Sequence, residues 1–170
     1  MVTLDPASYT VILRGNNNTT GVGLNEVYDL SQSAASSLTA VGTRAQVAVG
    51  DDVLISGIII SQGNSDILVR GLGPTLASAG IPSVLADPTL ELHGPAGFQT
   101  IINNNWRDTQ IAEIIATGIP PTNDLESAIV ANLAPGQYTG VLLGVGGGTG
   151  IAYIQFYTLP HSGPVLPLTP

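Results

Sequence analysis

Cysteine and lysine are absent from this 170-residue sequence, and charged residues make up only 9% of it. Without cysteine, the chain forms no disulfide and offers no thiolate to a metal ion. Its four basic residues are all arginine, and against twelve acidic residues they leave a net charge of −8. Because nucleic acids and anionic lipid surfaces attract basic proteins, this balance argues against both as partners.

Aromatic residues and long apolar runs are also scarce. Aromatic residues account for 5% of the chain, with a single tryptophan. No apolar run approaches the roughly 20 residues that a membrane-spanning helix needs, so we expect no membrane insertion. The first residues lack the basic and apolar regions of a signal peptide. If the protein is secreted, we therefore expect this sequence to represent its mature portion.

No catalytic or cofactor-binding motif is recognisable. The only histidines, His93 and His161, are far apart and lack ligand spacing, which disfavours a histidine-based metal site or catalytic triad. The glycines of residues 71–74 suggest a phosphate-binding loop, but the Lys-Ser/Thr pair of such a loop does not follow them, so we interpret them as a turn. We expect neither an enzyme nor a bound cofactor.

What the sequence does contain is a repeat. Residues 4–10 (LDPASYT) match residues 133–139 (LAPGQYT), and the match runs without a gap to Leu30 and Leu159. The offset is constant, since 133 minus 4 is 129. A repeat of this kind indicates a modular array or an assembling protein rather than an enzyme.

Alternating apolar residues predict short strands separated by Gly, Pro and Asn turns. We predict an all-β fold, an antiparallel, jelly-roll-like β-sandwich with an extra N-terminal hairpin. The strand over residues 53–60 is apolar on both faces and is therefore predicted to be central. Residues 111–116 are predicted to form a short helix or a loop crossing, and residues 127–133 a strand. The predicted organisation is a hairpin at 1–30 that repeats 133–159, a linker at 31–43, the sandwich at 44–159 and an extended Pro-rich tail at 160–170.

One stretch resembles the bacterial pre-peptidase C-terminal domain, a small jelly-roll-like sandwich of secreted bacterial proteins. Residues 86–93 carry its D-P-x-L-x-L strand, and a Gly turn and an Asn-rich segment lead on to L-x-P-G-x-Y-T at residues 133–139.

The chain is more closely similar to tandem repeats of large cell-surface proteins of environmental bacteria, over residues 31–159 and again over 4–30. This resemblance implies an extracellular, adhesive or structural role and no catalytic residues. The chain departs from these repeats at Thr158-Leu159, where Asp-Leu is usual, as in Asp29-Leu30. The shared motifs are Thr43-Arg44, Gly50-Asp51, Val69-Arg70, Gly73-Pro74-Thr75-Leu76, Ala86-Asp87-Pro88, Asn105-Trp106, Glu126-Ser127-Ala128-Ile129, Pro135-Gly136 and Tyr157.

The two predicted hairpins differ on one face. In the first copy this face carries Arg14 and Asn25, as in a sheet with one solvated side, whereas the second copy has Leu143 and Ile154 there. Exposing such side chains forfeits roughly 1.5–3 kcal/mol each, so something must cover them. The cover is the tail, the N-terminal hairpin or a neighbouring subunit, and the simpler alternative is packing within the chain. The predicted assembly interface comprises Val2, Leu4, Tyr9, Val11, Leu13, Val141, Leu143, Ile154 and Phe156.

Three minor sites are weighed against simpler interpretations. Oxygen-rich residues suit calcium but equally suit turns; they are Asp51, Asp52, Asn103, Asn105 and Asp108. Asn17 and Asn18 each begin a glycosylation sequon in a predicted exposed turn. Trp106 either stacks on a sugar or anchors the core or a loop, and the second role is commoner for tryptophan.

We expect a structural subunit of an extracellular filament or surface array, located outside the cell or on its surface. Copies would form a homo-polymer in which a strand or hairpin of one copy pairs with the next, since a lone hairpin is marginal and an exposed sheet edge accepts a strand. The alternative is a carbohydrate- or surface-binding module of a larger adhesin. A third alternative is an accessory domain of a secreted enzyme.

Overall fold

The computed structural model describes residues 2–30 and 38–160, which divide into two units between Leu38 and Thr39. The second unit contains eight described strands. They are β1 (Ala40–Val47), β2 (Leu54–Ile60), β3 (Ser65–Leu72), β4 (Pro88–His93), β5 (Ile101–Asn103), β6 (Ser127–Leu133), β7 (Gly136–Gly144) and β8 (Gly150–Thr158).

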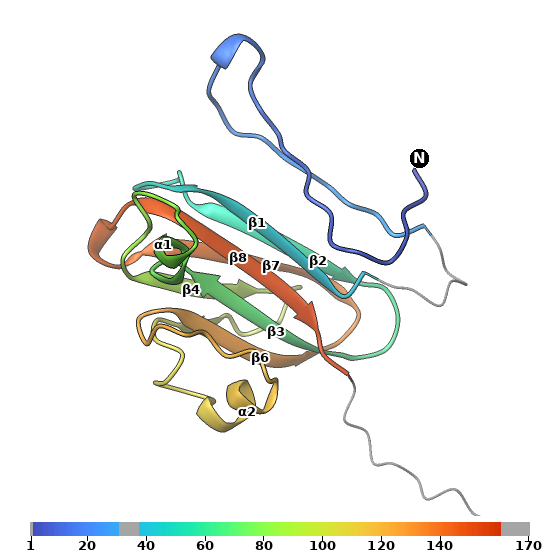
Figure 1. Cartoon of the computed structure of the whole chain (residues 1–170). Coiled ribbons are helices and arrows are strands. Elements are labelled where there is room, and N and C mark those ends of the chain that lie inside the picture. The colour runs from blue at the N-terminus through green and yellow to red at the C-terminus, as the bar shows by residue number, and fades with distance from the viewer. Residues whose placement is uncertain (1, 31–37, 161–170) are drawn as a thin grey trace, which may run out of the picture. The chain divides into compact units, whose positions relative to one another are not determined.

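The strands form two four-stranded antiparallel sheets (Figure 1). Sheet A has the order β1-β8-β3-β6, and sheet B has the order β2-β7-β4-β5. The pairs β1–β8, β2–β7, β3–β6 and β4–β5 are all antiparallel. A chain folded into nested pairs in this way and wrapped over two sheets is a jelly roll. The predicted fold class is confirmed.

Alternation along the strands builds the core between the sheets. Successive residues of β4 and β8 are buried and half-buried in turn, because side chains of a strand point to opposite faces. Phe156, Leu142 and Ile154 are among the fully buried side chains. Burial of each stabilises the fold by about 1.5–3 kcal/mol.

A second, smaller core lies on the opposite face of sheet A. Helix α2 (Ile111–Ala116) places Ile114 against Leu68, Trp106 and Ala128. The sequence predicted a short helix or a loop here, and the structure forms the helix. The other described helices are α1 (Thr75–Ser78) and the 3-10 turns η1 (Asn16–Asn18) and η2 (Val145–Gly147).

The N-terminal unit differs from its prediction. No strand is present among residues 2–30, although the sequence predicted a hairpin of two strands, and the chain turns back at η1 (Figure 1). A strand needs a hydrogen-bonded neighbour, and an isolated two-stranded hairpin is marginal in water. The predicted polar turn is present, but no ladder forms on either side of it within the single chain.

Three further expectations are corrected. Residues 133–159 are not a hairpin, because β7 and β8 lie in opposite sheets and are joined through η2. The strand predicted to be central, β2, lies at the edge of sheet B. The start of β1 at Ala40 places residues 40–43 of the predicted linker in a strand. Residues 31–37 of that linker, and residues 161–170 of the predicted tail, lie outside the described residues.

Candidate assembly interface

Residues 2–30, named here the N-terminal segment, expose apolar side chains along their whole length. Every large apolar side chain there is more than half exposed, and no described residue of the segment is buried. The five interface residues predicted here belong to this set. The exposed residues are Val2, Leu4, Tyr9, Val11, Ile12, Leu13, Val22, Leu24, Val27, Tyr28 and Leu30.

The turn of the segment has the backbone conformation of the turn between β7 and β8. Asn17 and Asn18 have φ of 51° and 59°, and their counterparts at the offset of 129 residues, Gly146 and Gly147, have φ of 60° and 79°. In each turn the fourth residue donates its N–H to the first carbonyl, at 3.1 Å in η1 and 3.0 Å in η2. Asparagine tolerates this left-handed region better than most residues, so it replaces glycine with little strain.

A tyrosine contact also recurs at the same offset. The Tyr9 hydroxyl donates to the Asp5 carbonyl oxygen at 2.8 Å, and the Tyr138 hydroxyl donates to the Ala134 carbonyl oxygen at 3.0 Å. Tyr138 is buried in the sandwich, whereas Tyr9 is exposed. The segment therefore keeps local geometry of the β7–η2–β8 region without the surroundings that bury it there.

The four interface residues predicted in the C-terminal copy do not share a surface. Ile154 and Phe156 are buried in the core, so their assignment to an assembly interface is wrong and the alternative of packing within the chain holds. The opposite sheet of the same sandwich covers them. Val141 and Leu143 alternate with buried residues of β7 and are half-buried on the outer face of sheet B. The error follows from treating β7 and β8 as one sheet.

The outer face of sheet B carries apolar residues that the sequence analysis did not include. Ile55 lies opposite Val141, Val141 opposite Glu91, and Glu91 opposite Ile102 in one row across the sheet. Ile55, Ile59 and Ile102 are 55%, 62% and 59% exposed, which is unusual for three isoleucines on one face. The sequence does show that β2 is apolar on both faces, but the sequence analysis attributed this pattern to a central position in a sheet.

The four sheet edges differ in how they are protected. At the edge of β6, the Asn103 side-chain oxygen accepts the N–H of Ala128, and the Gln110 amide pairs with both backbone groups of Val130. β5 has only three residues, and β1 carries the exposed Arg44. Short strands and charges both discourage pairing with another chain. β2 has neither protection, since its seven residues, LISGIII, contain no charge.

The calcium candidates are distributed over two loops. Asp51 and Asp52 lie in the turn between β1 and β2, while the other three follow or end β5. Asn103 uses its amide oxygen on Ala128 and its amide nitrogen on the Asn105 carbonyl oxygen and the Thr109 hydroxyl. Within the described ranges, no cluster of three histidine or acidic side chains is placed to hold a metal ion.

The remaining sequence candidates fall in two different environments. Trp106 is 2% exposed and donates its ring N–H to the Asn123 carbonyl oxygen, so its ring is not available to a sugar. Asn17 and Asn18 are exposed in η1, as their predicted turn requires. Tyr28, also in the segment, donates a hydrogen bond to the Glu26 carboxylate, and this contact raises the pKa of Tyr28.

A buried glutamate, missed by the sequence analysis, fixes the loop after β3. The Glu126 carboxylate is fully buried and accepts the N–H groups of Gly73 and Thr75 at 3.1 and 2.8 Å and the Thr75 hydroxyl at 2.7 Å. These are the donors that an anion would need in a glycine-rich loop. Because an internal carboxylate already occupies them, the loop is a structural turn, as its sequence predicts.

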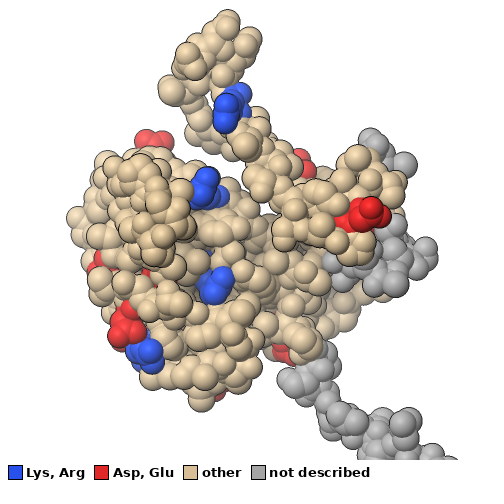
Figure 2. Space-filling view, in the orientation of Figure 1, with Lys and Arg blue, Asp and Glu red and all other residues tan. Residues whose placement is uncertain are grey.

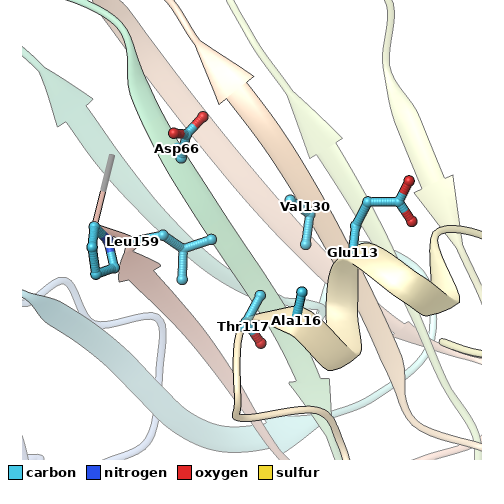
Figure 3. Close-up of a pocket in the computed structure, with 7 residues that line it drawn as sticks. Asp66, Glu113, Ala116, Thr117, Val130 and Leu159 are labelled. Atoms are coloured by element: carbon cyan, nitrogen blue, oxygen red, sulfur yellow. The ribbon is translucent and has the colours of Figure 1, made fainter. Parts of the chain in front are cut away.

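A pocket of about 480 Å³ lies between α2 and the outer face of sheet A (Figure 3). Asp66 and Glu113 are its two acidic residues, and Figure 3 shows the Glu113 carboxylate directed away from Asp66. The rest of the lining is Ala116, Thr117, Val130, Leu159 and Pro160. Two carboxylates that do not converge, among largely apolar neighbours, form no arrangement for acid–base catalysis.

Charge is sparse over the molecular surface that Figure 2 shows. Apart from one blue side chain that adjoins a red one, the charged side chains are separated there by uncharged areas, in agreement with the low charged fraction of the sequence. None of the helices in the described ranges has the length and apolar character that a membrane crossing demands. Large apolar side chains are exposed both on the N-terminal segment and on the outer face of sheet B.

Fold and surface together define a jelly-roll β-sandwich with an attached apolar segment. Among solved structures, it is similar to the pre-peptidase C-terminal domain of a collagenase from Bacillus anthracis, the family that part of the sequence resembles. The match has a TM-score of 0.44 and 14% identity and covers 69% of this chain and 89% of that one. No protein-family profile matches the sequence, and no curated protein does.

Proposed function

We propose that this chain is a non-enzymatic structural subunit of an extracellular filament or surface array. In this array, the N-terminal segment of one subunit is completed by strands of a neighbouring sandwich. The observation that carries the proposal is the segment itself, whose large apolar side chains are all exposed. Covering a side chain such as Leu24 contributes about 1.5–3 kcal/mol, so a partner surface gives a large gain that the isolated chain forgoes.

The sandwich supports the proposal from the other side. On the outer face of sheet B, Ile55 of the uncharged edge strand β2 lies opposite Val141 of β7. Ile59 is exposed further along β2, and Leu143 is half-buried on β7. An unpaired, uncharged edge strand is a template for strand addition. Head-to-tail assembly needs two different surfaces on each subunit, one of which binds the other on the next subunit. In this proposal, these surfaces are the apolar N-terminal segment and the unpaired edge of β2.

An extracellular location is supported by the resemblance of the sequence to repeats of bacterial cell-surface proteins. The alternative of a carbohydrate-binding module gains no support from the described sandwich, residues 39–160. Its exposed large apolar side chains are all aliphatic, and its single tryptophan is buried. Stacking on a sugar ring needs an accessible aromatic face.

The test compares the full chain with a variant lacking residues 1–38, by negative-stain microscopy and light scattering. We expect ordered particles from the full chain and monomers from the shortened one. The sandwich has its own core, so the fluorescence of Trp106 should confirm that both proteins are folded. A matched control replaces Thr10 or Thr20, which are polar, with Asp and should leave assembly intact. Uniform monomers of the full chain, or unchanged particles after deletion, would refute the proposal.

A further inference from the structure

We infer that the N-terminal segment is the seventh and eighth strands of a second jelly roll, and that its partner is a set of strands of the β1–β6 type. This rests on the proposed function and names the partner and its register. In that register Leu4 takes the place of Leu133, and each later residue takes the place of the residue 129 positions further on.

The turn conformation carries the first step. In the sandwich, η2 takes the chain from sheet B to sheet A, so β7 and β8 pair with different neighbours rather than with each other. The segment holds the same backbone conformation at η1. The segment therefore keeps the turn that, in the sandwich, joins a strand of sheet B to a strand of sheet A.

The distribution of charge carries the second step. The four charged residues of the segment have counterparts that are all exposed or half-buried in the sandwich. Of the eight counterparts that are buried, seven correspond to an apolar residue or a glycine in the segment. Such a separation of charged from apolar positions is expected when one face of a strand packs in a core, and it is not required of a segment that remains in solvent. The charged residues are Asp5, Arg14, Glu26 and Asp29; the buried positions correspond to Leu4, Tyr9, Val11, Leu13, Gly21, Gly23, Asn25 and Val27.

Packing between the two strands carries the third step. A Cβ atom built on Gly140 lies 2.6 Å from Ile154 Cδ1 and 3.0 Å from Phe156 Cζ, so a side chain at that position requires these two side chains to shift. The segment has Val11 there, and the two opposing positions carry the smaller Asn25 and Val27. The gain of volume on one strand is matched by losses on the other. Such an exchange is expected if Val11 packs against Asn25 and Val27 across a sandwich core.

The sandwich of the same chain cannot accept the segment in this register. β7 lies between β2 and β4, and β8 lies between β1 and β3, so both places are filled. Two sources supply the same chemistry: strands that precede the segment in a longer polypeptide, and a second copy whose own β7 and β8 are displaced.

The experiment extends the chain rather than shortening it. Residues 39–132 are placed directly before Leu4, so that Leu4 follows Asn132 as Leu133 does in the sandwich. We expect a monomer with a second cooperative unfolding transition, and amide exchange over residues 9–13 slowed by about 100-fold or more relative to the unextended chain. A matched pair of variants, Leu13→Asp and Ile12→Asp, tests the register. Their counterparts, Leu142 and Val141, are buried in the core and half-buried on the outer face.

Leu13→Asp should abolish the added transition, while Ile12→Asp should leave it. If a second copy is the partner, the unextended chain will show concentration-dependent oligomers that Leu13→Asp, but not Ile12→Asp, dissociates. The inference is overturned if residues 9–13 stay unprotected in the extended chain and the unextended chain shows no such oligomers. Equal effects of the two substitutions overturn it as well. The extended chain needs no filament, so failure of the array proposal leaves this readout intact.

Discussion

The substitution Gly140→Val gives the sandwich the residue that the N-terminal segment has at the corresponding position, Val11. The new side chain enters the space of Ile154 and Phe156, which are both buried. Overpacking of this kind costs about 1–3 kcal/mol. Phe156→Val, the other half of the exchange, leaves a cavity in the core and costs about 2–4 kcal/mol.

The double variant should be more stable than the two single costs imply, because the removed ring makes room for the added methyl groups. We expect a coupling of about 1–2 kcal/mol in the double-mutant cycle. Urea unfolding followed by Trp106 fluorescence measures each free energy of unfolding. Trp106 is buried within the sandwich, so the signal reports on this unit.

A control cycle combines Gly140→Val with Leu68→Ala. Leu68 is fully buried but belongs to the core on the other face of sheet A. Distant sites usually add within about 0.5 kcal/mol, so this cycle should show no coupling. If Gly140→Val and Phe156→Val are simply additive, the packing argument for the N-terminal segment is refuted.

Three further measurements follow from the same structure. Tyr138→Phe should lower the free energy of unfolding by about 0.5–1.5 kcal/mol, because it removes a hydroxyl donor from a buried ring, whereas Tyr9→Phe should leave urea unfolding of the sandwich unchanged. Glu126→Ala leaves two N–H groups without their acceptor and should cost about 2–4 kcal/mol, with a smaller loss for Glu126→Gln; an equal loss for both in thermal unfolding would contradict this account. Ile55→Lys places a charge on the open edge strand and should weaken self-association in sedimentation velocity while leaving the unfolding midpoint nearly unchanged.

Local features of the sandwich could be predicted well from the sequence. The predicted strand over residues 127–133 coincides with β6, and residues 111–116, predicted as a short helix or a loop, form α2. Alternation of apolar residues and glycine or proline turns determine such features over a few residues.

The long-range features could not be predicted in this way. Alternation shows which residues of β7 and of β8 share a face, but it does not show that the two strands lie in different sheets. The turn between them does not show it either, because two successive residues with positive φ, such as Gly146 and Gly147, are also typical of β-hairpin turns. Because β7 and β8 were treated as neighbours in one sheet, Ile154 and Phe156 were wrongly assigned to a surface.

The edge position of β2 has a similar cause. A strand that is apolar on both faces is expected wherever both faces are covered. In the single chain, one face is covered by the core, and Ile55 and Ile59 remain exposed on the other. The hydrophobic pattern of β2 shows that both faces are apolar, but it does not show whether another part of the chain packs against each face.

The central position of the last two strands also has a consequence for synthesis. In the pairing of β1 with β8, Ala40 lies opposite Tyr157, which is 117 residues further along the chain, since 157 minus 40 is 117. Contacts so distant in sequence slow folding, and neither sheet can close before the final strands leave the ribosome. Until then each sheet lacks the strand that joins its first strand to the rest of the sheet. During translation, β1 and β2 therefore remain without their neighbours until β8 and β7 have been synthesised.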